Sequence, residues 1–376
     1  MRKSKQLFSE ITSQGQLNFS LEQVEVPEPQ ENEVIVRIEA TPINPSDMWP
    51  MFGPANLAEA ELNYSDDSAL LTAPVHQGLL PRVASRLDQK LPVGNEGAGT
   101  VVAAGSGAIA QSLMGKVVGV LTGSVYSEYV CAPITACLVH NEGTTPKQAA
   151  SSFVNPLTAL AMVETMREEG HSAIVHTAAA SNLGQILNQI CLKDDVPLIN
   201  VVRKQEQVDL LKSQGAKIVC NSSDDSFQED LYQAIAQTNA TLGFDATGGG
   251  ELVSDILTAM ERFGSKDIKG LNTYGSMHKK QVYVYGSLDF SPTILNRAYG
   301  MFWGIGGWLL MPYLMKSSPE KVAQMHKRVA DEIDSTFKAH FSDELNFKEV
   351  MTPEVIHQYN AKKTGQKVIL NPSLSA

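Results

Sequence analysis

The first 145 residues carry their hydrophobic positions in short runs, a pattern typical of β-strands. Residues 34–38 form a short apolar run with one charged residue, and the runs at 99–104 and 116–121 are rich in β-branched residues and bounded by glycines. A further short run lies at 126–132. Because helical periodicity is scarce in this region, the pattern predicts a β-rich first domain.

From about residue 145 the pattern changes to alternating helices and strands. A helix-compatible stretch at 146–168 is interrupted at Asn155-Pro156, and short apolar runs then alternate with amphipathic stretches. The predicted strands are 173–176, 198–202, 217–220, 242–245 and 282–285, and the predicted helices are 182–192, 205–214, 227–238 and 252–263. Strands joined in this way form a doubly wound parallel sheet, which binds ligands at the carboxyl ends of its strands.

The end of the chain predicts how the two parts are connected. A polar helix is expected at 319–340 and a terminal strand at 366–370. We expect this strand to return to the first domain, which makes the α/β part an insertion. The predicted organisation is therefore a β-rich domain of residues 1–152 and 318–376 and a doubly wound domain of residues 153–317.

Two segments lack a regular period. Residues 51–91 mix acidic residues, prolines and scattered apolar positions, and a connection of this length is usually a lid or binding loop, or else disordered. Residues 299–315 are uncharged but contain four glycines and a proline, and they are too short for a membrane-spanning helix. We expect the second segment to form a buried strand, or an oligomer or substrate surface.

Composition narrows the class of protein. Hydrophobic residues make up 43% of the 376 residues and charged residues 19%, which predicts a globular chain, and a net charge of -11 argues against a nucleic-acid partner. The four cysteines include no C-x-x-C pair, and the basic start of the chain is not followed by an apolar stretch before Asn18. The sequence therefore predicts a cytoplasmic protein with reduced thiols and no membrane association.

A candidate phosphate-binding turn lies between the first strand and first helix of the doubly wound part. In the segment 177–184, the small residues Ala179, Ser181 and Gly184 occupy the places of the three glycines in the dinucleotide fingerprint. Asn182 and Leu183 open the helix, where free N–H groups and the helix dipole favour phosphate. The alternative is an ordinary small-residue turn in an α/β sheet.

The end of the second strand points to the kind of dinucleotide. An acidic residue there would bind the adenosine ribose 2′-hydroxyl of NAD, whereas a cation binds the 2′-phosphate of NADP. The chain has Arg203 and Lys204 at this place and no carboxylate. A guanidinium binds phosphate bidentately, so we predict NADPH as the cofactor. The alternative is that both are solvated helix-cap residues.

Several blocks together resemble the medium-chain dehydrogenase/reductase superfamily. They are Gly94 to Val102, Ser127 to Val130 and Asn155 to Ala159, followed by the nucleotide-binding part. The resemblance extends over nearly the whole chain. It implies a GroES-like catalytic domain and a Rossmann domain that binds the cofactor.

The resemblance also implies chemistry without a metal. Zinc-dependent members have a cysteine where this chain has Asn44 and a histidine where it has Asn95, and an amide is a poor zinc ligand. The chain is similar to the zinc-free branch of NADPH:quinone oxidoreductases and enoyl or alkenal reductases. We predict hydride transfer to a quinone-like acceptor, with a 2-alkenal or enoyl reductase, or a non-catalytic NADPH-binding protein, as alternatives.

The family places a tyrosine shortly after its Asn-Pro-x-Asp block in reductases that act on enoyl thioesters. Residues 51–56 of this chain contain no tyrosine, and Tyr64 is the nearest one downstream. We therefore name Tyr64 as the candidate proton donor. Because no tyrosine stands at the family's position for the proton donor, we favour a quinone-like acceptor.

The remaining candidate residues follow from the resemblance, and each has a structural alternative. Asn44 is expected to bind substrate or nicotinamide ribose, or else to cap a turn. Asn155 and Thr158 are expected near the cofactor, or else mark a helix kink at the proline. Gly286 and Ser287 are expected at the nicotinamide. Lys367 is expected to reach the cofactor or solvent.

The acceptor and the oligomeric state are predicted from apolar side chains. Four large aromatic side chains suggest that the substrate is small and hydrophobic or aromatic. They are Trp49, Phe302, Trp303 and Trp308. The family often dimerises through an edge strand of the nucleotide-binding sheet. Since the uncharged segment 299–315 could supply such a surface, we predict a homodimer.

Overall fold

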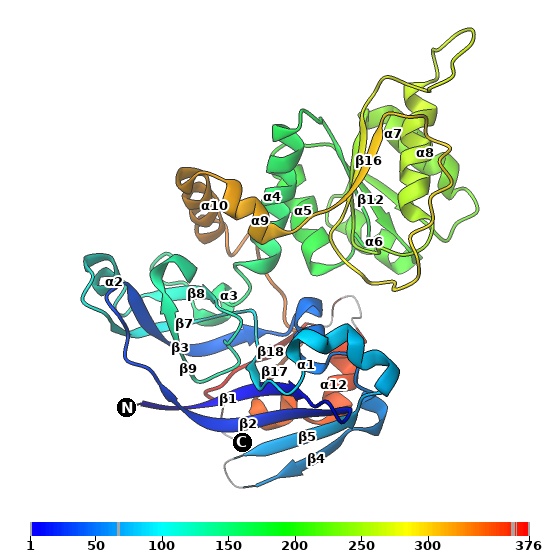
Figure 1. The fold of residues 1–376 in the computed structure, drawn as a ribbon. Coiled ribbons are helices and arrows are strands. Elements are labelled where there is room, and N and C mark those ends of the chain that lie inside the picture. The colour runs from blue at the N-terminus through cyan, green and yellow to red at the C-terminus, as the bar shows by residue number, and fades with distance from the viewer. Residues whose placement is uncertain (1, 66–67, 362–364, 366, 375–376) are drawn as a thin grey trace. The chain divides into compact units, whose positions relative to one another are not determined.

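The computed structural model describes residues 2–65, 68–361, 365 and 367–374. By its internal contacts the chain divides into two compact units (Figure 1). Unit 1 comprises Met1–Val154 and His326–Ala376, and unit 2 comprises Asn155–Met325.

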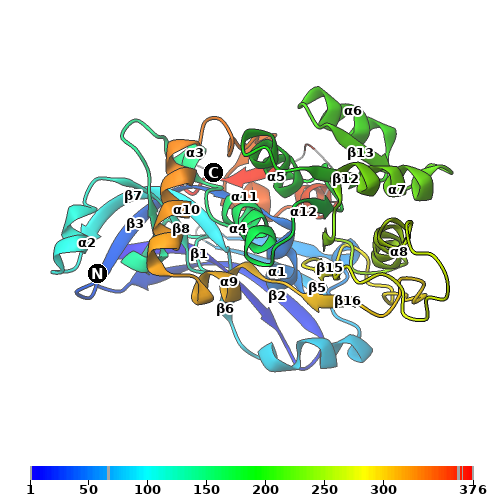
Figure 2. The ribbon, with the colours of Figure 1, turned by 90° about the horizontal axis from the view of Figure 1, so that it is seen from above.

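The first sheet of unit 1 has five strands in the order β4-β5-β2-β1-β6. The long strands β1 (Arg2–Ile11) and β2 (Gln16–Val26) form an antiparallel pair that both views show side by side (Figure 1 and Figure 2). Leu7 of β1 lies opposite Leu21 of β2, and alternate residues of each strand are buried in the core. The other strands are β4 (Glu61–Tyr64), β5 (Ala69–Pro74) and β6 (Leu91–Pro92).

The second sheet of unit 1 has seven strands and carries the returning end of the chain. Its order is β10-β8-β7-β3-β18-β17, and β9 also pairs with β3. Its strands are β3 (Glu33–Pro42), β7 (Glu96–Ala104), β8 (Val117–Leu121), β9 (Tyr129–Pro133), β10 (Cys137–Val139), β17 (Asp343–Leu345) and β18 (Val368–Leu370). The antiparallel pairing of β18 with β3 confirms that the terminal strand returns to the first domain.

The expectation of an irregular connection at 51–91 is wrong. This segment contributes β4, β5 and β6 to the first sheet, together with two 3₁₀ helices, Leu57–Glu59 and Gln77–Arg86. Along β5, residues alternate between buried and more exposed positions. The alternation is hidden in the sequence because the exposed position at Leu70 is as apolar as the buried Leu71 next to it.

Unit 2 contains a six-stranded parallel sheet in the order β13-β12-β11-β14-β15-β16. Its strands are β11 (Ile174–His176), β12 (Leu198–Val202), β13 (Ile218–Asn221), β14 (Leu242–Asp245), β15 (Lys280–Val284) and β16 (Trp303–Gly307). The connecting helices are α5 (Asn182–Lys193), α6 (Gln205–Ser213), α7 (Phe227–Thr238) and α8 (Leu252–Gly264). The strand order reverses between β11 and β14, and ligands of such sheets bind at this switch point. This is the predicted doubly wound sheet.

The remaining helices are α1 (Met48–Phe52), α2 (Ala108–Ser112), α3 (Pro146–Ala149), α4 (Val154–Glu168), α9 (Leu310–Lys316), α10 (Pro319–Asp331), α11 (Phe347–Val350) and α12 (Pro353–Asn360). Of these helices, α4 and α10 are long and the others have eight residues or fewer. The predicted helix 319–340 is too long, since α10 ends at Asp331 and turns follow. The uncharged segment 299–315 forms β16 and α9. Within the described part of the chain, no helix is long and apolar enough to cross a membrane.

Candidate functional site

The turn between β11 and α5 has the geometry of a phosphate-binding turn. Ala178 adopts a left-handed backbone conformation with φ 48°, which reverses the chain directly after the strand. Ser181 then caps α5, because its Oγ accepts the N–H of Gly184 at 3.1 Å. The turn therefore aims the start of α5 at the carboxyl edge of the sheet.

Gly184 allows this helix to approach the strand closely. A Cβ added at Gly184 would lie 2.2 Å from the carbonyl oxygen of Ala179, which is a backbone atom and cannot move aside easily. Ala179 is itself fully buried, and its N–H donates to the carbonyl of Val201 in β12. The three small residues predicted for this turn are thus in close contact, and the third place admits only glycine.

The amides of Asn182 and Leu183 are the candidate ligands for phosphate. As the first residues of α5 they have no intrahelical acceptor, and neither N–H has another acceptor within the described ranges. Both residues are partly exposed. The dipole of this twelve-residue helix adds positive potential at the same place, so a pyrophosphate fits the turn.

Arg203 and Lys204 lie at the carboxyl end of β12, as predicted from the sequence. Both side chains are exposed, and neither has an ion-pair partner among the residues that the structure describes. The backbone of Arg203 is fixed instead, because its N–H donates to Gln207 and its carbonyl accepts the hydroxyl of Ser223 at 2.8 Å. These two positively charged side chains, held on a turn with a hydrogen-bonded backbone, are therefore available to bind a phosphate dianion.

A buried hydrogen-bond network joins the ends of β11 and β14. The hydroxyl of Thr177 donates to Oδ1 of Asp245 at 2.6 Å and accepts the N–H of Ala246. The Asp245 carboxylate also accepts the N–H groups of Thr247 and Gly248. Sequence reasoning missed this network, although an aspartate at a strand end before three glycines is a signal for it.

A second tie joins β11 to the turn after β15. Nε2 of the fully buried His176 lies 2.7 Å from the hydroxyl of Tyr285. Burial lowers the pKa of His176 to about 3 and raises the pKa of Tyr285, so both groups are neutral at physiological pH. Sequence analysis did not identify this pair.

Gly286 and Ser287 line a pocket of about 500 Å³ at the carboxyl ends of β15 and β16. The other lining residues are Val284, Tyr285, Gly307, Trp308, Leu309 and Pro312. A Cβ added at Gly286 would lie 2.6 Å from the carbonyl oxygen of Ala246, so this turn packs directly on the end of β14. Of the four large aromatic residues that were predicted to contact the substrate, Trp308 lines this pocket.

In unit 1, Asn44 belongs to a buried polar cluster that we call the Glu96 cluster: Asn44, Asp47, Glu96, Ser151 and Lys367. The side-chain amide of Asn44 donates to Oε1 of Glu96 at 2.8 Å, and its backbone N–H donates to Asp47 at 2.8 Å. Asp47 also accepts the N–H of Asn95. Burial raises the pKa of Asp47 to about 7, against the opposing effect of these amides.

Glu96 and Lys367 complete this cluster. Oε2 of Glu96 accepts the N–H groups of Phe153 and Val154, at the start of α4. Nζ of Lys367 donates to Oγ of Ser151 at 2.5 Å, and Ser151 in turn reaches Oε1 of Glu96 at 3.4 Å. Burial lowers the pKa of Lys367, and the Glu96 and Asp47 carboxylates act in the opposite direction. Lys367 is 3% exposed, so its ammonium does not extend into bulk solvent.

The other predicted residues lie elsewhere. Tyr64 lies in edge strand β4, is 50% exposed, and donates its hydroxyl to the carbonyl of Lys348 at 3.3 Å. Asn155 and Thr158 lie in the first turns of α4, Asn155 partly exposed and Thr158 buried. The structure gives no contact that joins Tyr64 to the Glu96 cluster within the described residues.

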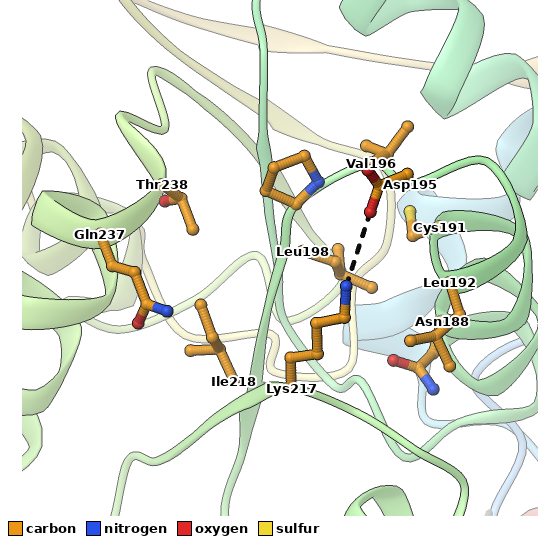
Figure 3. A pocket seen from close by; sticks show the side chains of 11 residues that line it. Asn188, Cys191, Leu192, Asp195, Val196, Leu198, Lys217, Ile218, Gln237 and Thr238 are labelled. Atoms are coloured by element: carbon orange, nitrogen blue, oxygen red, sulfur yellow. Dashed lines mark ion pairs between the residues drawn. The ribbon is translucent and has the colours of Figure 1, made fainter.

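A second, smaller pocket of about 200 Å³ lies at the opposite edge of the unit 2 sheet. Figure 3 shows the Lys217–Asp195 ion pair among its lining side chains, which come from the amino ends of β12 and β13 and the carboxyl ends of α5 and α7. It contains none of the predicted site residues. No group of three or more His, Cys, Asp or Glu side chains that could hold a metal ion occurs in the described ranges.

Comparison with solved structures identifies the fold. A β-rich unit and a doubly wound parallel sheet are the fold of the solved structures on which the chain superposes, and this is the GroES-like and Rossmann architecture that the resemblance implied. The chain superposes on a candidate NADPH:quinone reductase from Mesorhizobium loti with a TM-score of 0.71 and 24% identity, covering 98% of each chain. It superposes on Etr1p in complex with NADP and crotonyl-CoA with a TM-score of 0.66 and 19% identity, covering 99% of this chain and 100% of that one.

The chain also has relatives by sequence. The chain is 26% identical over 271 residues to the mitochondrial enoyl-[acyl-carrier-protein] reductase of Caenorhabditis elegans, which covers 70% of this chain and 68% of that enzyme. Alignments to its mammalian and plant counterparts cover 59 to 68% of those proteins. No family model matches the chain.

Proposed function

We propose that this protein is an NADPH-dependent oxidoreductase that reduces a quinone-like electrophilic acceptor without a metal ion. The observation that carries the proposal is one edge of the unit 2 sheet, where the Gly184 turn and the exposed cations Arg203 and Lys204 lie at neighbouring strand ends. We assign cofactor binding to residues 153–317 and the GroES-like catalytic domain to residues 1–152 and 318–376. Complexes of fold neighbours with NADP or NADPH support the choice of cofactor.

The chain's own groups fit the dinucleotide from its adenosine end. The amides of Asn182 and Leu183, together with the α5 dipole, hold the pyrophosphate. Arg203 and Lys204 bind the ribose 2′-phosphate, and no carboxylate competes at this place in the turn. When bound, NADPH supplies a hydride from C4 of its nicotinamide ring.

The nicotinamide end is assigned to the turn after β15. Gly286 and Ser287 present backbone to the 500 Å³ pocket, and Trp308, Leu309 and Pro312 give it an apolar wall. A wall of this kind excludes water and favours a small hydrophobic or aromatic acceptor. We assign Asn155 and Thr158 to the cofactor as well, by the resemblance.

A quinone acceptor is consistent with the lack of a tyrosine at the family's position for the proton donor, because quinone reduction does not require a protein acid. The acceptor takes up one hydride and one proton to become a hydroquinone, and its negatively charged oxygen can take the proton from water. Tyr64 remains the candidate donor only if its hydroxyl leaves the carbonyl of Lys348. Asn44, bonded to Glu96, provides an amide and not a thiolate at the family's zinc position.

Reduction of an activated carbon–carbon double bond is the second candidate. The observation that favours it is that the relatives by sequence are enoyl-[acyl-carrier-protein] reductases. Such a substrate needs the same hydride but a proton at carbon, which a protein acid or an ordered water must deliver. Tyr64→Phe would lower this activity and leave quinone reduction unchanged.

A steady-state assay of NADPH oxidation distinguishes these functions. The purified protein, dialysed against a chelator, is offered quinones, 2-alkenals and enoyl thioesters, with NADH in parallel. Turnover of quinones with NADPH is the expected result. Turnover restricted to enones or thioesters would favour the second candidate. Binding of NADPH without turnover of any acceptor would indicate a non-catalytic protein, and loss of turnover in the chelator would contradict the metal-free mechanism.

We also propose a homodimer formed through β16. This strand ends the order of the unit 2 sheet, and among described strands it pairs only with β15. Apolar side chains near it are well exposed, including Met301 at 72% and Leu309 at 66%. An edge strand with exposed apolar neighbours is suited to pairing with a second copy.

A cytoplasmic location is proposed from the cysteines. All four thiols, Cys131, Cys137, Cys191 and Cys220, are free, and burial raises the pKa of Cys137 and Cys220 to about 12. Such thiols resist oxidation and need no disulfide partner, as is usual in a reducing compartment. Fractionation of cells that express the native chain tests this location.

A further inference from the structure

Tyr285 connects three neighbouring strand ends of the unit 2 sheet. It directly follows β15, and its backbone N–H donates to the carbonyl of Asp245 at the end of β14. Its side chain extends further, to His176 at the end of β11, where the hydroxyl and Nε2 are 2.7 Å apart. The two rings are nearly parallel, with an interplanar angle of 17° and centroids 5.8 Å apart.

The connection is not sensitive to pH in the physiological range. His176 is fully buried and stays neutral, because burial lowers its pKa to about 3. Burial raises the pKa of Tyr285, and the nearby Asp245 carboxylate acts in the same direction. Neither group ionises near neutral pH, so the hydrogen bond persists there.

The hydrogen bond between Tyr285 and His176 joins residues next to the 500 Å³ pocket to residues next to the turn before α5. On the β15 side, the residues after Tyr285 are Gly286 and Ser287, which line the 500 Å³ pocket. On the β11 side, Thr177 follows His176 and begins the phosphate-binding turn. The bond therefore fixes the separation between the pocket and the turn, which a dinucleotide must span with its two halves.

We propose that Tyr285 and His176 are positioning residues for the nicotinamide half of the dinucleotide, holding the Gly286–Ser287 turn at a fixed distance from the phosphate-binding turn. This inference rests on the proposed function, since it assumes that the dinucleotide spans both places. Neither side chain needs to touch the cofactor. The bond acts through the backbone of the residues that follow Tyr285.

Two ligands separate this role from a general effect on the fold. NADP⁺ spans both places, whereas adenosine 2′,5′-bisphosphate carries only the adenosine end. Tyr285→Phe keeps the ring and removes one hydrogen bond. By calorimetric titration, it should weaken NADP⁺ about three- to tenfold and change the affinity for adenosine 2′,5′-bisphosphate less than twofold.

Tyr283→Phe is the matched control. Tyr283 lies two residues earlier on β15, and its hydroxyl donates to Glu169 at 2.6 Å, away from the pocket. The control should leave both affinities unchanged. His176→Phe removes the same bond from its other end, so it should reproduce the loss for NADP⁺, and the double variant should add nothing to either single change.

Three results would overturn the inference. Equal weakening of both ligands by Tyr285→Phe would show a structural role, and unchanged affinity for both would show no role. Additive effects in the double variant would show that the two residues act independently. If the wild-type protein bound neither ligand, the proposed function would fail together with this inference, whereas the first three results leave that function standing.

Discussion

The side-chain amide of Asn44 donates to Oε1 of Glu96 across 2.8 Å, and both residues are almost completely buried. Glu96 accepts hydrogen bonds from two side chains, Asn44 and Ser151, through Oε1 and from the two backbone amides at the start of α4 through Oε2. A single carboxylate satisfies donors from two segments that are distant in sequence, Asn44 and residues 151–154. Its removal would leave all of them unpaired inside the protein.

Glu96→Ala is therefore expected to destabilise unit 1 by about 3–5 kcal/mol, because it leaves buried amides unpaired and removes a carboxylate that favours the charged form of buried Lys367. Urea unfolding followed by circular dichroism measures the change. Glu22→Ala is the control, since it removes a surface carboxylate that pairs with Lys90 and should cost less than about 1 kcal/mol. Equal losses in the two variants would contradict the buried role of Glu96.

Asp47 should make stability depend on pH. Its pKa is raised from 3.8 to about 7 in the folded protein, so between these values the folded state holds a proton that the unfolded state has lost. Stability from this group is present at low pH and is lost as the pH rises toward 7. From pH 5 to pH 8 the loss should be about 2–3 kcal/mol.

Asp47→Asn removes this titration, so the decline in unfolding free energy from pH 5 to pH 8 should shrink by that amount. The measurement is urea unfolding at both pH values. Asp209→Asn, at an exposed position on α6, controls for the general effect of losing a carboxylate and should leave the pH dependence as it is. If the unfolding free energy of Asp47→Asn fell between pH 5 and pH 8 as much as that of the wild-type protein, the raised pKa of Asp47 would be contradicted.

Local patterns in the sequence predicted the elements that are built from local contacts. The β11 turn, the start of α5 at Asn182 and the place of Arg203 at the end of β12 all depend on residues close in the chain. For this reason the doubly wound sheet and the small-residue turn before α5 could be predicted in outline. The helix predicted at 319–340 was overextended because its polar pattern continues past Asp331, where the chain turns instead.

Contacts between residues that are distant in sequence could not be predicted, because they produce no periodic pattern in the sequence. Thr177 meets Asp245 and His176 meets Tyr285 across 68 and 109 residues, and no period in the sequence links them. Asn44 was predicted as a functional residue by resemblance, and its bond to Glu96 could not be seen from either segment alone. Strand β5 was missed because its exposed position at Leu70 is as apolar as its buried positions.

Gly184→Ala should destabilise unit 2 by about 1–3 kcal/mol and weaken dinucleotide binding. The added carbon would lie 2.2 Å from a backbone oxygen, so either the helix start or the turn must shift. Thermal unfolding and titration with NADP⁺ measure the two effects. For stability the control is Gly307→Ala, where nothing lies within 4 Å of the added carbon. A stability of Gly184→Ala equal to that of the control would contradict the close helix–strand packing.

Phe302→Glu should separate the proposed dimer. The residue is 47% exposed and directly precedes edge strand β16, where a charge opposes pairing with a second copy. Sedimentation velocity should show a dimer for the wild-type protein and a monomer for this variant. Met114→Glu, at a 45% exposed position in unit 1, should remain dimeric. A monomeric wild-type protein, or a variant that stays dimeric, would refute the β16 interface.

Arg203→Glu should change the choice of coenzyme. The wild-type guanidinium is exposed and has no ion-pair partner in the described ranges, so its charge is available to a 2′-phosphate, and a carboxylate there would repel it. The affinity for NADPH should fall about tenfold or more, while the affinity for NADH stays within about threefold. Fluorescence titration with both coenzymes measures the two values. Lys217→Glu makes the same charge change at the opposite edge of the sheet, where Lys217 pairs with Asp195, and it should alter neither affinity. An equal loss for both coenzymes in Arg203→Glu would mean that the cation supports the turn itself, because only a contact with the 2′-phosphate can distinguish two ligands that are otherwise the same.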